Sequence, residues 1–112
     1  MQLISGVIQP HRLQIVKDAL KAVDVHGLTV TDAAGYGAQG GHSEVYRGAE
    51  VRIDFVPKKR IDVLVADENV DAVIEAIVAA ARTGSIGDGK LWTVPVHNVV
   101  RVRTGERGPA AI

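Results

Sequence analysis

The apolar residues of this chain follow two spacings, and the order in which those spacings alternate limits the fold more than any other feature. Apolar residues at every second position predict strands over residues 2–8, 28–34 and 60–66. A last strand is predicted over residues 91–102. It is interrupted at Pro95, because proline cannot donate a ladder hydrogen bond and belongs at a sheet edge or a bulge.

Spacings of three and four residues predict two helices between these strands. The first begins at Pro10, which suits the first turn of a helix, and carries Arg12 on its solvated face. The second is expected to have Asp67 as its N-cap and Arg82 as a favourable cation at its C-terminus, and to end at Gly84. The predicted order is therefore strand, helix, strand, strand, helix, strand.

That order predicts an α+β chain with the ferredoxin-like βαββαβ fold. Two right-handed β-α-β halves give a four-stranded antiparallel sheet with both helices on one face. The opposite face would be bare, and Ile4, Ile8 and Leu64 are expected to need cover there. We therefore expect an oligomer in which the sheets of several copies pack together.

Length and composition limit the class of protein. A chain of 112 residues with 46% hydrophobic residues suffices for one domain, over residues 1–112. Thirteen basic residues balance thirteen acidic ones, which argues against a general nucleic-acid-binding or membrane-surface protein. The absence of cysteine excludes disulfides and thiolate metal sites. No apolar run reaches the roughly 18 residues of a membrane span and no signal peptide is visible, so we expect a cytoplasmic protein without membrane insertion.

A glycine-rich stretch at residues 82–90 is the first candidate binding site. It holds three glycines in six residues, and glycine permits positive φ angles that let successive N–H groups point into one concavity. The letters from Gly84 to Lys90 fit a Walker A loop. However, Leu91 replaces the residue that binds magnesium, and a helix precedes the loop where a strand should stand. An anion-binding nest and a plain helix C-cap with a turn both remain open, and a second basic run at residues 101–108 favours the nest.

Residues 35–57 are the second candidate, because no regular period runs through most of them. A loop of about 15 residues or more inside a compact domain is uncommon and is usually functional or disordered. Tyr46, Arg47 and Glu50 near its tip are side chains suited to binding a partner, whereas the alternative is an insertion without a role.

Seven short runs, spread along the whole chain, carry a resemblance to a known family. They are GLTVT at 27–31, GYG at 35–37 with Gln39, GH at 41–42, VYRGAE at 45–50, AARTG at 80–84, IGDGK at 86–90 and VRVRTGERG at 100–108. Together they resemble the PII nitrogen-regulatory signal-transduction proteins. The resemblance implies a homotrimer with the fold predicted above and with ATP or ADP in each cleft between subunits. Residues 35–57 would be the T-loop region, residues 84–90 the B-loop, and residues 101–112 the C-terminal strand end and tail.

The resemblance also implies which residues hold the nucleotide. Backbone N–H groups of the B-loop would cradle phosphates, with Lys90 adding charge. Arg101 and Arg103 alternate on one face of the predicted last strand, so both would reach the same polyphosphate. The expected nucleotide-binding set is Thr29, Gly35, Gly37, Ala38, Gln39, Asp62, Leu64, Gly87, Asp88, Gly89, Lys90, Arg101 and Arg103.

A second ligand follows from the same resemblance. In the family, magnesium bound with ATP completes a site for 2-oxoglutarate. Gln39 would contact the Mg²⁺ ion, and the 2-oxoglutarate residues would be Gln39, Gly41, Lys58 and Gly87.

Some positions depart from the family pattern. Ala38 and Gly40 stand where relatives often have basic residues, so we expect weaker phosphate contacts. Ala49 and Val51 lack the hydroxyl groups that relatives have modified, so we expect no covalent modification at either position.

The expected function is a PII-type signal transducer. It would bind ATP or ADP, and 2-oxoglutarate with Mg-ATP, and would regulate nitrogen-metabolism targets such as an ammonium transporter through its T-loop. One alternative is a specialised paralogue that senses adenine nucleotides without 2-oxoglutarate. Another is a small nucleotide-hydrolysing enzyme that uses Lys90 and the arginines as a phosphate clamp. No set of nucleophile, base and acid is apparent, so we expect a regulatory protein with slow ATP turnover at most.

Overall fold

The structure, a computed structural model, describes residues 1–37, 42–46, 49–53 and 55–112. Its main sheet has the strand order β2–β5–β1–β6, and every neighbouring pair is antiparallel. The strands are β1 (Gln2–Ile8), β2 (Thr29–Gly35), β5 (Val56–Val65) and β6 (Gly89–Pro95).

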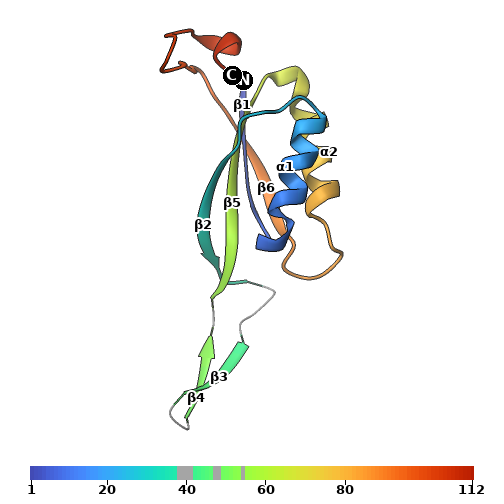
Figure 1. Cartoon of the computed structure of the whole chain (residues 1–112), viewed down its shortest axis with the longest axis vertical. Helices are drawn as coiled ribbons and strands as arrows, with labels where there is room; N and C mark the ends of the chain where they lie inside the picture. The colour runs from blue at the N-terminus through green and yellow to red at the C-terminus, as the bar shows by residue number, and fades with distance from the viewer. Residues whose placement is uncertain (38–41, 47–48, 54) are drawn as a thin grey trace.

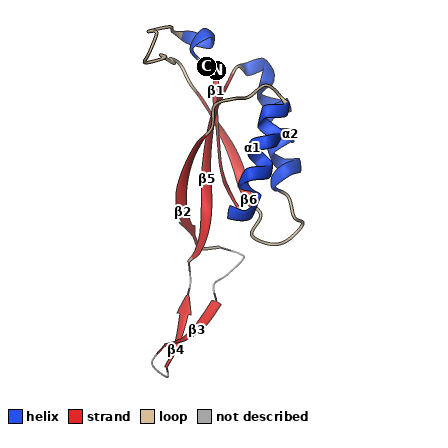
Figure 2. Cartoon of the chain, viewed as in Figure 1, coloured by secondary structure: helices blue, strands red, loops and turns tan. Residues whose placement is uncertain are grey.

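Both helices lie on one face of this sheet, as Figures 1 and 2 show. They are α1 (Leu13–Ala22) and α2 (Val70–Ala81). The predicted α+β fold, with two helices on one face of a four-stranded antiparallel sheet, is therefore confirmed. Among the described residues, no helix has the length and apolar character needed to cross a bilayer.

A separate two-stranded ribbon extends beyond one end of the main sheet (Figure 1). It consists of β3 (His42–Tyr46) and β4 (Ala49–Ile53), paired from His42 with Ile53 to Tyr46 with Ala49. The long loop predicted from the sequence thus contains a hairpin. Ala38, Gln39, Gly41 and Arg47 lie outside the described residues.

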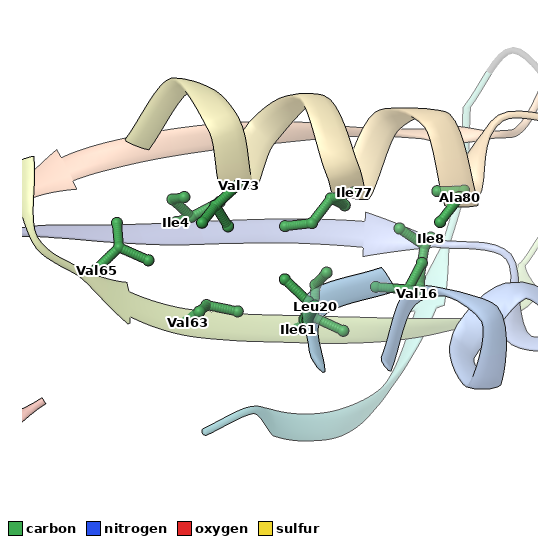
Figure 3. Packing of buried hydrophobic residues seen from close by; sticks show 11 residues of the cluster. Ile4, Ile8, Val16, Leu20, Ile61, Val63, Val65, Val73, Ile77 and Ala80 are labelled. Carbon is green, nitrogen blue, oxygen red and sulfur yellow. The ribbon is translucent and has the colours of Figure 1, made fainter. Parts of the chain in front are cut away.

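The core lies between the helices and the sheet (Figure 3). Ile4 and Ile8 of β1 are 0% and 1% exposed, and they pack with apolar residues of both helices and of β5. The expectation that Ile4 and Ile8 need cover from another copy was therefore wrong. The register of β1 turns both side chains toward the helices, because Ile4 pairs with Val63, which is also in the core.

The opposite face of the sheet is uncovered in the single chain. We call it the open face; the strand register assigns to it Leu3, Ser5 and Val7 of β1, Arg60, Asp62 and Leu64 of β5, and Lys90, Trp92 and Val94 of β6. Leu64, Trp92 and Val94 are 36%, 38% and 43% exposed. Leu64 alone of the three residues predicted to need cover lies on this face.

The second helix does not begin as predicted. Asp67 is the first residue of a 3-10 turn, Asp67–Asn69, and the N-cap position of α2 is occupied by Asn69. The Asp67 carboxylate instead lies 2.8 Å from the amino group of Met1. An ion pair between chain positions so far apart is not visible in local sequence, so the N-cap assignment was wrong.

The last strand is shorter than predicted. It starts at Gly89 and ends at Pro95, which lies opposite Gln2, the first residue of β1; one further backbone hydrogen bond runs from the Val96 amide to the Met1 carbonyl. Residues 99–108 instead fold back on themselves, with Val100 opposite Arg107 and with the amide of Gly108 donating to the carbonyl of Val99.

Candidate functional site

A cavity of about 670 Å³ lies at the end of the sheet where β5 ends. We call it the tail pocket. Thr29, Asp62 and Leu64, three of the expected nucleotide-binding residues, all line it, and so do Pro109, Ala111 and Ile112 of the tail. This contribution from the tail was not predicted, because residues 103–112 have no apolar period.

Asp62 is held firmly in this region. Its carboxylate accepts a hydrogen bond of 2.6 Å from the Ser5 hydroxyl and two of 3.2 and 3.3 Å from the Arg60 guanidinium. The hydrogen bond from Arg60 lowers the pKa of Asp62 most strongly; partial burial opposes this shift and the bond from Ser5 adds to it. Asp62 is therefore an ionised side chain bound to the open face, where Arg60 also lies 5.5 Å from the centre of the Trp92 ring.

Arg101 and Arg103 do not lie on a strand, which corrects the prediction. Residues 101–106 form a turn, closed by hydrogen bonds from the Arg101 amide to the Glu106 carbonyl and from the Gly105 amide to the Arg101 carbonyl. The Arg101 guanidinium lies 3.2 Å from the Glu106 carboxylate and donates to the carbonyl of Ile112. Arg101 is thus adjacent to the tail pocket, and Arg103 is exposed.

Residues 82–89, the loop between α2 and β6 together with the first residue of β6, form a second group, which we call the glycine loop. Gly84, Gly87 and Gly89 have φ angles of 87°, 101° and 98°, in the region that favours glycine. A Cβ atom on Gly89 would lie 1.7 Å from the carbonyl oxygen of Val7. Glycine is thus required there for close packing against β1.

Side chains fix the shape of the glycine loop. The Asp88 carboxylate accepts hydrogen bonds from the Thr83 hydroxyl, from the Thr83 amide at 2.8 Å and from the Gly84 amide at 2.9 Å. The bond from the Thr83 hydroxyl lowers the pKa of Asp88 most strongly, and the backbone amides add to the shift.

Lys58 connects the glycine loop to β5. Its ammonium group donates a hydrogen bond of 2.6 Å to the carbonyl of Gly87, and the side chain is 7% exposed. Burial lowers the pKa of Lys58, and the nearby Asp88 carboxylate works in the opposite direction. A Cβ atom on Gly35 would lie 3.3 Å from Cγ of Lys58, so the end of β2 belongs to the same group.

An aromatic pair marks the root of the β3–β4 ribbon. The rings of Tyr36 and Phe55 have centres 6.2 Å apart, and both residues are largely exposed. Tyr36 lies between Gly35 and Gly37, two of the predicted nucleotide residues. The sequence did not single out this pair, since the two residues are 19 positions apart in a stretch without a period.

The structure therefore sorts the predicted residues into two groups. One, at the Gly89 end of β6, contains Gly35, Lys58 and the glycine loop, and the other, at its Pro95 end, contains the tail pocket and Arg101 (Figure 1). The seven residues of β6 span about 20 Å at roughly 3.3 Å per step. No residue of the glycine loop lines the tail pocket. One copy of the described chain thus does not join the two groups into one site.

Comparisons with known proteins agree on one family. A family model described as "Nitrogen regulatory protein P-II" matches residues 1–106. A relative from Rhizobium meliloti (strain 1021) named "Nitrogen regulatory protein P-II" is 54% identical over 112 residues, which cover all of both chains. A protein of the same name from Azospirillum brasilense is 53% identical over the same extent. "Nitrogen regulatory protein GlnK" from Escherichia coli (strain K12) is 46% identical, again over all of both chains.

Proposed function

Because the chain belongs to the nitrogen regulatory protein P-II family, we propose that it is a cytoplasmic signal transducer that binds ATP or ADP between subunits of a homotrimer. The family supports the signalling role, and the curated relatives are named as regulatory proteins. The nucleotide, the trimer and the targets are the parts that we propose.

The observation that carries this proposal is the division of the predicted nucleotide residues between the two ends of β6. A nucleotide has an apolar base at one end and a polyphosphate at the other. The tail pocket offers Leu64, Pro109 and Ile112 as apolar surface for a base. The glycine loop offers backbone N–H groups for phosphates, and Lys90, the next residue along the chain, offers its ammonium group. If the tail pocket of one copy faces the glycine loop of the next, the two halves form one complete site.

The residues of the glycine loop fit a phosphate chemically. Positive φ angles at Gly87 and Gly89 are those of backbone that can present successive N–H groups to an anion. Arg101 of the neighbouring copy would add a guanidinium, which matches phosphate oxygens in a bidentate way. With ATP, Mg²⁺ would be held by the phosphates and Gln39, and 2-oxoglutarate would place a carboxylate near Lys58, whose ammonium group already faces the glycine loop.

Control of targets through the T-loop follows from the position of the β3–β4 ribbon. Tyr36, between Gly35 and Gly37, contacts Phe55 on the other root of the ribbon, so a ligand near those glycines lies next to both roots. We propose that ligands favour one conformation of the T-loop, which then binds or releases a nitrogen-metabolism target such as an ammonium transporter. This requires the ligands to have different affinities for the two conformations.

Calorimetry tests the proposal directly. ATP and ADP are titrated into the protein, and 2-oxoglutarate is titrated with and without Mg-ATP, while a parallel assay measures phosphate release. We expect nucleotide binding, 2-oxoglutarate binding only with Mg-ATP, and little turnover. Rapid multiple turnover would instead support the hydrolase interpretation.

A nucleotide sensor that does not bind 2-oxoglutarate is the second candidate, and Ala38 and Gly40 are the observation that favours it. In that case 2-oxoglutarate would give no heat even with saturating Mg-ATP, although ATP itself binds.

A further inference from the structure

A carboxylate lies in the middle of the loop to which we assign phosphate binding. Asp88 stands between Gly87 and Gly89, two positions before Lys90. A negative side chain beside a phosphate would weaken binding by like-charge repulsion.

The Asp88 side chain points back into its own loop. It accepts hydrogen bonds from the amides of Thr83 and Gly84, five and four residues earlier, and from the Thr83 hydroxyl. These contacts close residues 83–88 into a ring that we call the Asp88 clasp. In the clasp the carboxylate is hydrogen-bonded to donors at the start of the glycine loop. The other end of the loop, with Gly87 and Gly89, is left to other partners.

We propose that Asp88 is a positioning residue that holds the glycine loop in its phosphate-binding conformation, with the Thr83 hydroxyl as its partner. This inference rests on the proposed nucleotide-binding function and assigns the side chain a role that is distinct from that of its backbone amide. Asp88 need not touch the ligand, because it acts through the backbone of the loop.

The glycines make such a clasp necessary. Glycine has more backbone freedom in the free chain than any other residue, so a loop with glycines at 84, 87 and 89 would sample many conformations if nothing fixed it. Each conformation that misplaces the N–H groups lowers the fraction of molecules ready to bind, and affinity falls by that fraction. Charge-assisted hydrogen bonds from amides to a carboxylate are strong enough to select one conformation.

Lys58 anchors the same loop from a different strand. Its ammonium group donates to the carbonyl of Gly87, directly next to Asp88. The Asp88 carboxylate favours the charged form of this lysine, against the effect of its burial. The clasp thus supports both the shape of the glycine loop and the charge of the lysine that holds it to β5.

One variant, Asp88→Asn, distinguishes two possible roles of Asp88, because the two roles predict opposite changes in ATP affinity. In Asp88→Asn the charge is removed, but the amide nitrogen that replaces one oxygen cannot accept a hydrogen bond. If Asp88 only repelled phosphate, this variant would bind ATP more tightly. If Asp88 positions the loop, it binds ATP and ADP about tenfold more weakly, as expected from the loss of one charge-assisted hydrogen bond.

The Thr83 hydroxyl supplies a rescue test. Thr83→Val removes the hydroxyl and should weaken ATP binding by about threefold to tenfold, the range for one lost hydrogen bond. Thr83→Ser keeps the hydroxyl and should bind like the wild type. Glu75→Gln, an exposed carboxylate on α2, is the matched control for loss of one negative charge.

The experiment measures binding of adenosine, ADP and ATP to the full chain by calorimetry, and amide hydrogen exchange of residues 83–89 without ligand. We expect Asp88→Asn and Thr83→Val to exchange faster in the loop and to lose affinity for ADP and ATP while their affinity for adenosine is unchanged. A general loss of stability would weaken the binding of all three ligands alike. Weaker binding of ADP and ATP with unchanged binding of adenosine therefore distinguishes positioning from simple destabilisation.

The outcomes separate the two proposals. If the wild type binds ATP and Asp88→Asn binds it equally well or better, or if loop exchange is unchanged, the positioning role is wrong and the proposed function stands. If the wild type binds no nucleotide, the proposed function is wrong and the positioning role falls with it.

Discussion

At the residue scale, the clearest constraint is Gly89. Its φ angle of 98° is strained for any other residue, and an added Cβ atom would lie 1.7 Å from the Val7 oxygen. We expect Gly89→Ala to lower the free energy of unfolding by roughly 3 kcal/mol or more, because both backbone strain and a backbone clash must be relieved. Urea unfolding at matched protein concentration measures this change.

Gly84 is the matched control for that prediction. It has a similar φ angle of 87°, but nothing lies within 4 Å of an added Cβ atom. Gly84→Ala should therefore cost only about 1–2 kcal/mol, the strain of a left-handed conformation. Equal costs for the two variants would mean that β1 does not pack closely on Gly89.

A second prediction at this scale concerns Asp62 and pH. The pKa of Asp62 is lower in the folded protein than its ordinary value near 4, because the folded state favours the carboxylate. Asp62 therefore stabilises the fold above about pH 4, and this contribution is lost as the pH falls through the folded pKa. We expect Asp62→Asn to be less stable by about 1–3 kcal/mol at pH 7.

The pH profile is the test of that assignment. The difference in unfolding free energy between wild type and Asp62→Asn should shrink steadily below about pH 4. Glu75→Gln, on the exposed side of α2, serves as the control and should show a much smaller difference at pH 7. A difference that stays constant down to acid pH would show that Asp62 contributes through shape and not through its charge.

At the element scale, the C-terminus of α2 is capped by a residue from elsewhere in the chain. Arg12 donates to the carbonyl of Ala80 from two guanidinium nitrogens, at 2.9 and 2.7 Å. Carbonyls in the last turn of a helix have no partner within the helix, and a cation is favoured there. We expect Arg12→Met, which keeps the aliphatic stem, to lower stability by about 1 kcal/mol and Tm by roughly 4 °C in thermal unfolding.

The control for this effect is Lys21→Met, which removes an exposed cation from α1. Its change in Tm should be smaller, since an exposed cation without a buried partner contributes little. If the two variants have the same Tm, the contact of Arg12 with α2 does not contribute to stability.

Elements whose signals are local were predicted well from the sequence, and elements that depend on distant partners were not. The alternation at residues 2–8 gave β1 with its bounds, because one face of that strand is buried. Arg12 was predicted as a solvated residue, yet it caps α2 through a contact 68 positions away. The last strand was predicted as far as Val102, because its valines alternate. It ends at Pro95, opposite the first residue of β1, and residues 99–108 pair with one another instead.

The candidate site shows the same division. The glycines at 84, 87 and 89 predict a loop with positive φ angles, and all three have positive φ angles in the structure. The Asp88 clasp was not predicted, because a side chain that bonds to its own loop leaves no pattern in the sequence. The contribution of the tail to the tail pocket was not predicted either, because the tail has no apolar period.

At the scale of the whole molecule, the open face and the divided site both favour an assembly of several copies of the chain. Leu64, Trp92 and Val94 stay exposed on a sheet whose other face carries both helices and the core, and apolar surface of this kind is usually covered by a partner. A second and third copy would cover it and would also bring a tail pocket to each glycine loop. Assembly and ligand binding are therefore expected to depend on each other.

Mixing two defective variants tests that dependence. Lys90→Ala removes a cation from the glycine-loop half of the site, and Arg101→Ala removes one from the tail half. Each variant alone should bind ATP at least tenfold more weakly, since a charge-assisted contact with phosphate is lost. In the proposed trimers, formed by refolding the two variants together, some sites would combine the intact loop of one variant with the intact tail of the other. Those sites should bind ATP with wild-type affinity in calorimetry, in a fraction set by the mixing ratio. Sites contained within one chain would remain defective in every mixture, because each copy would keep its own lesion.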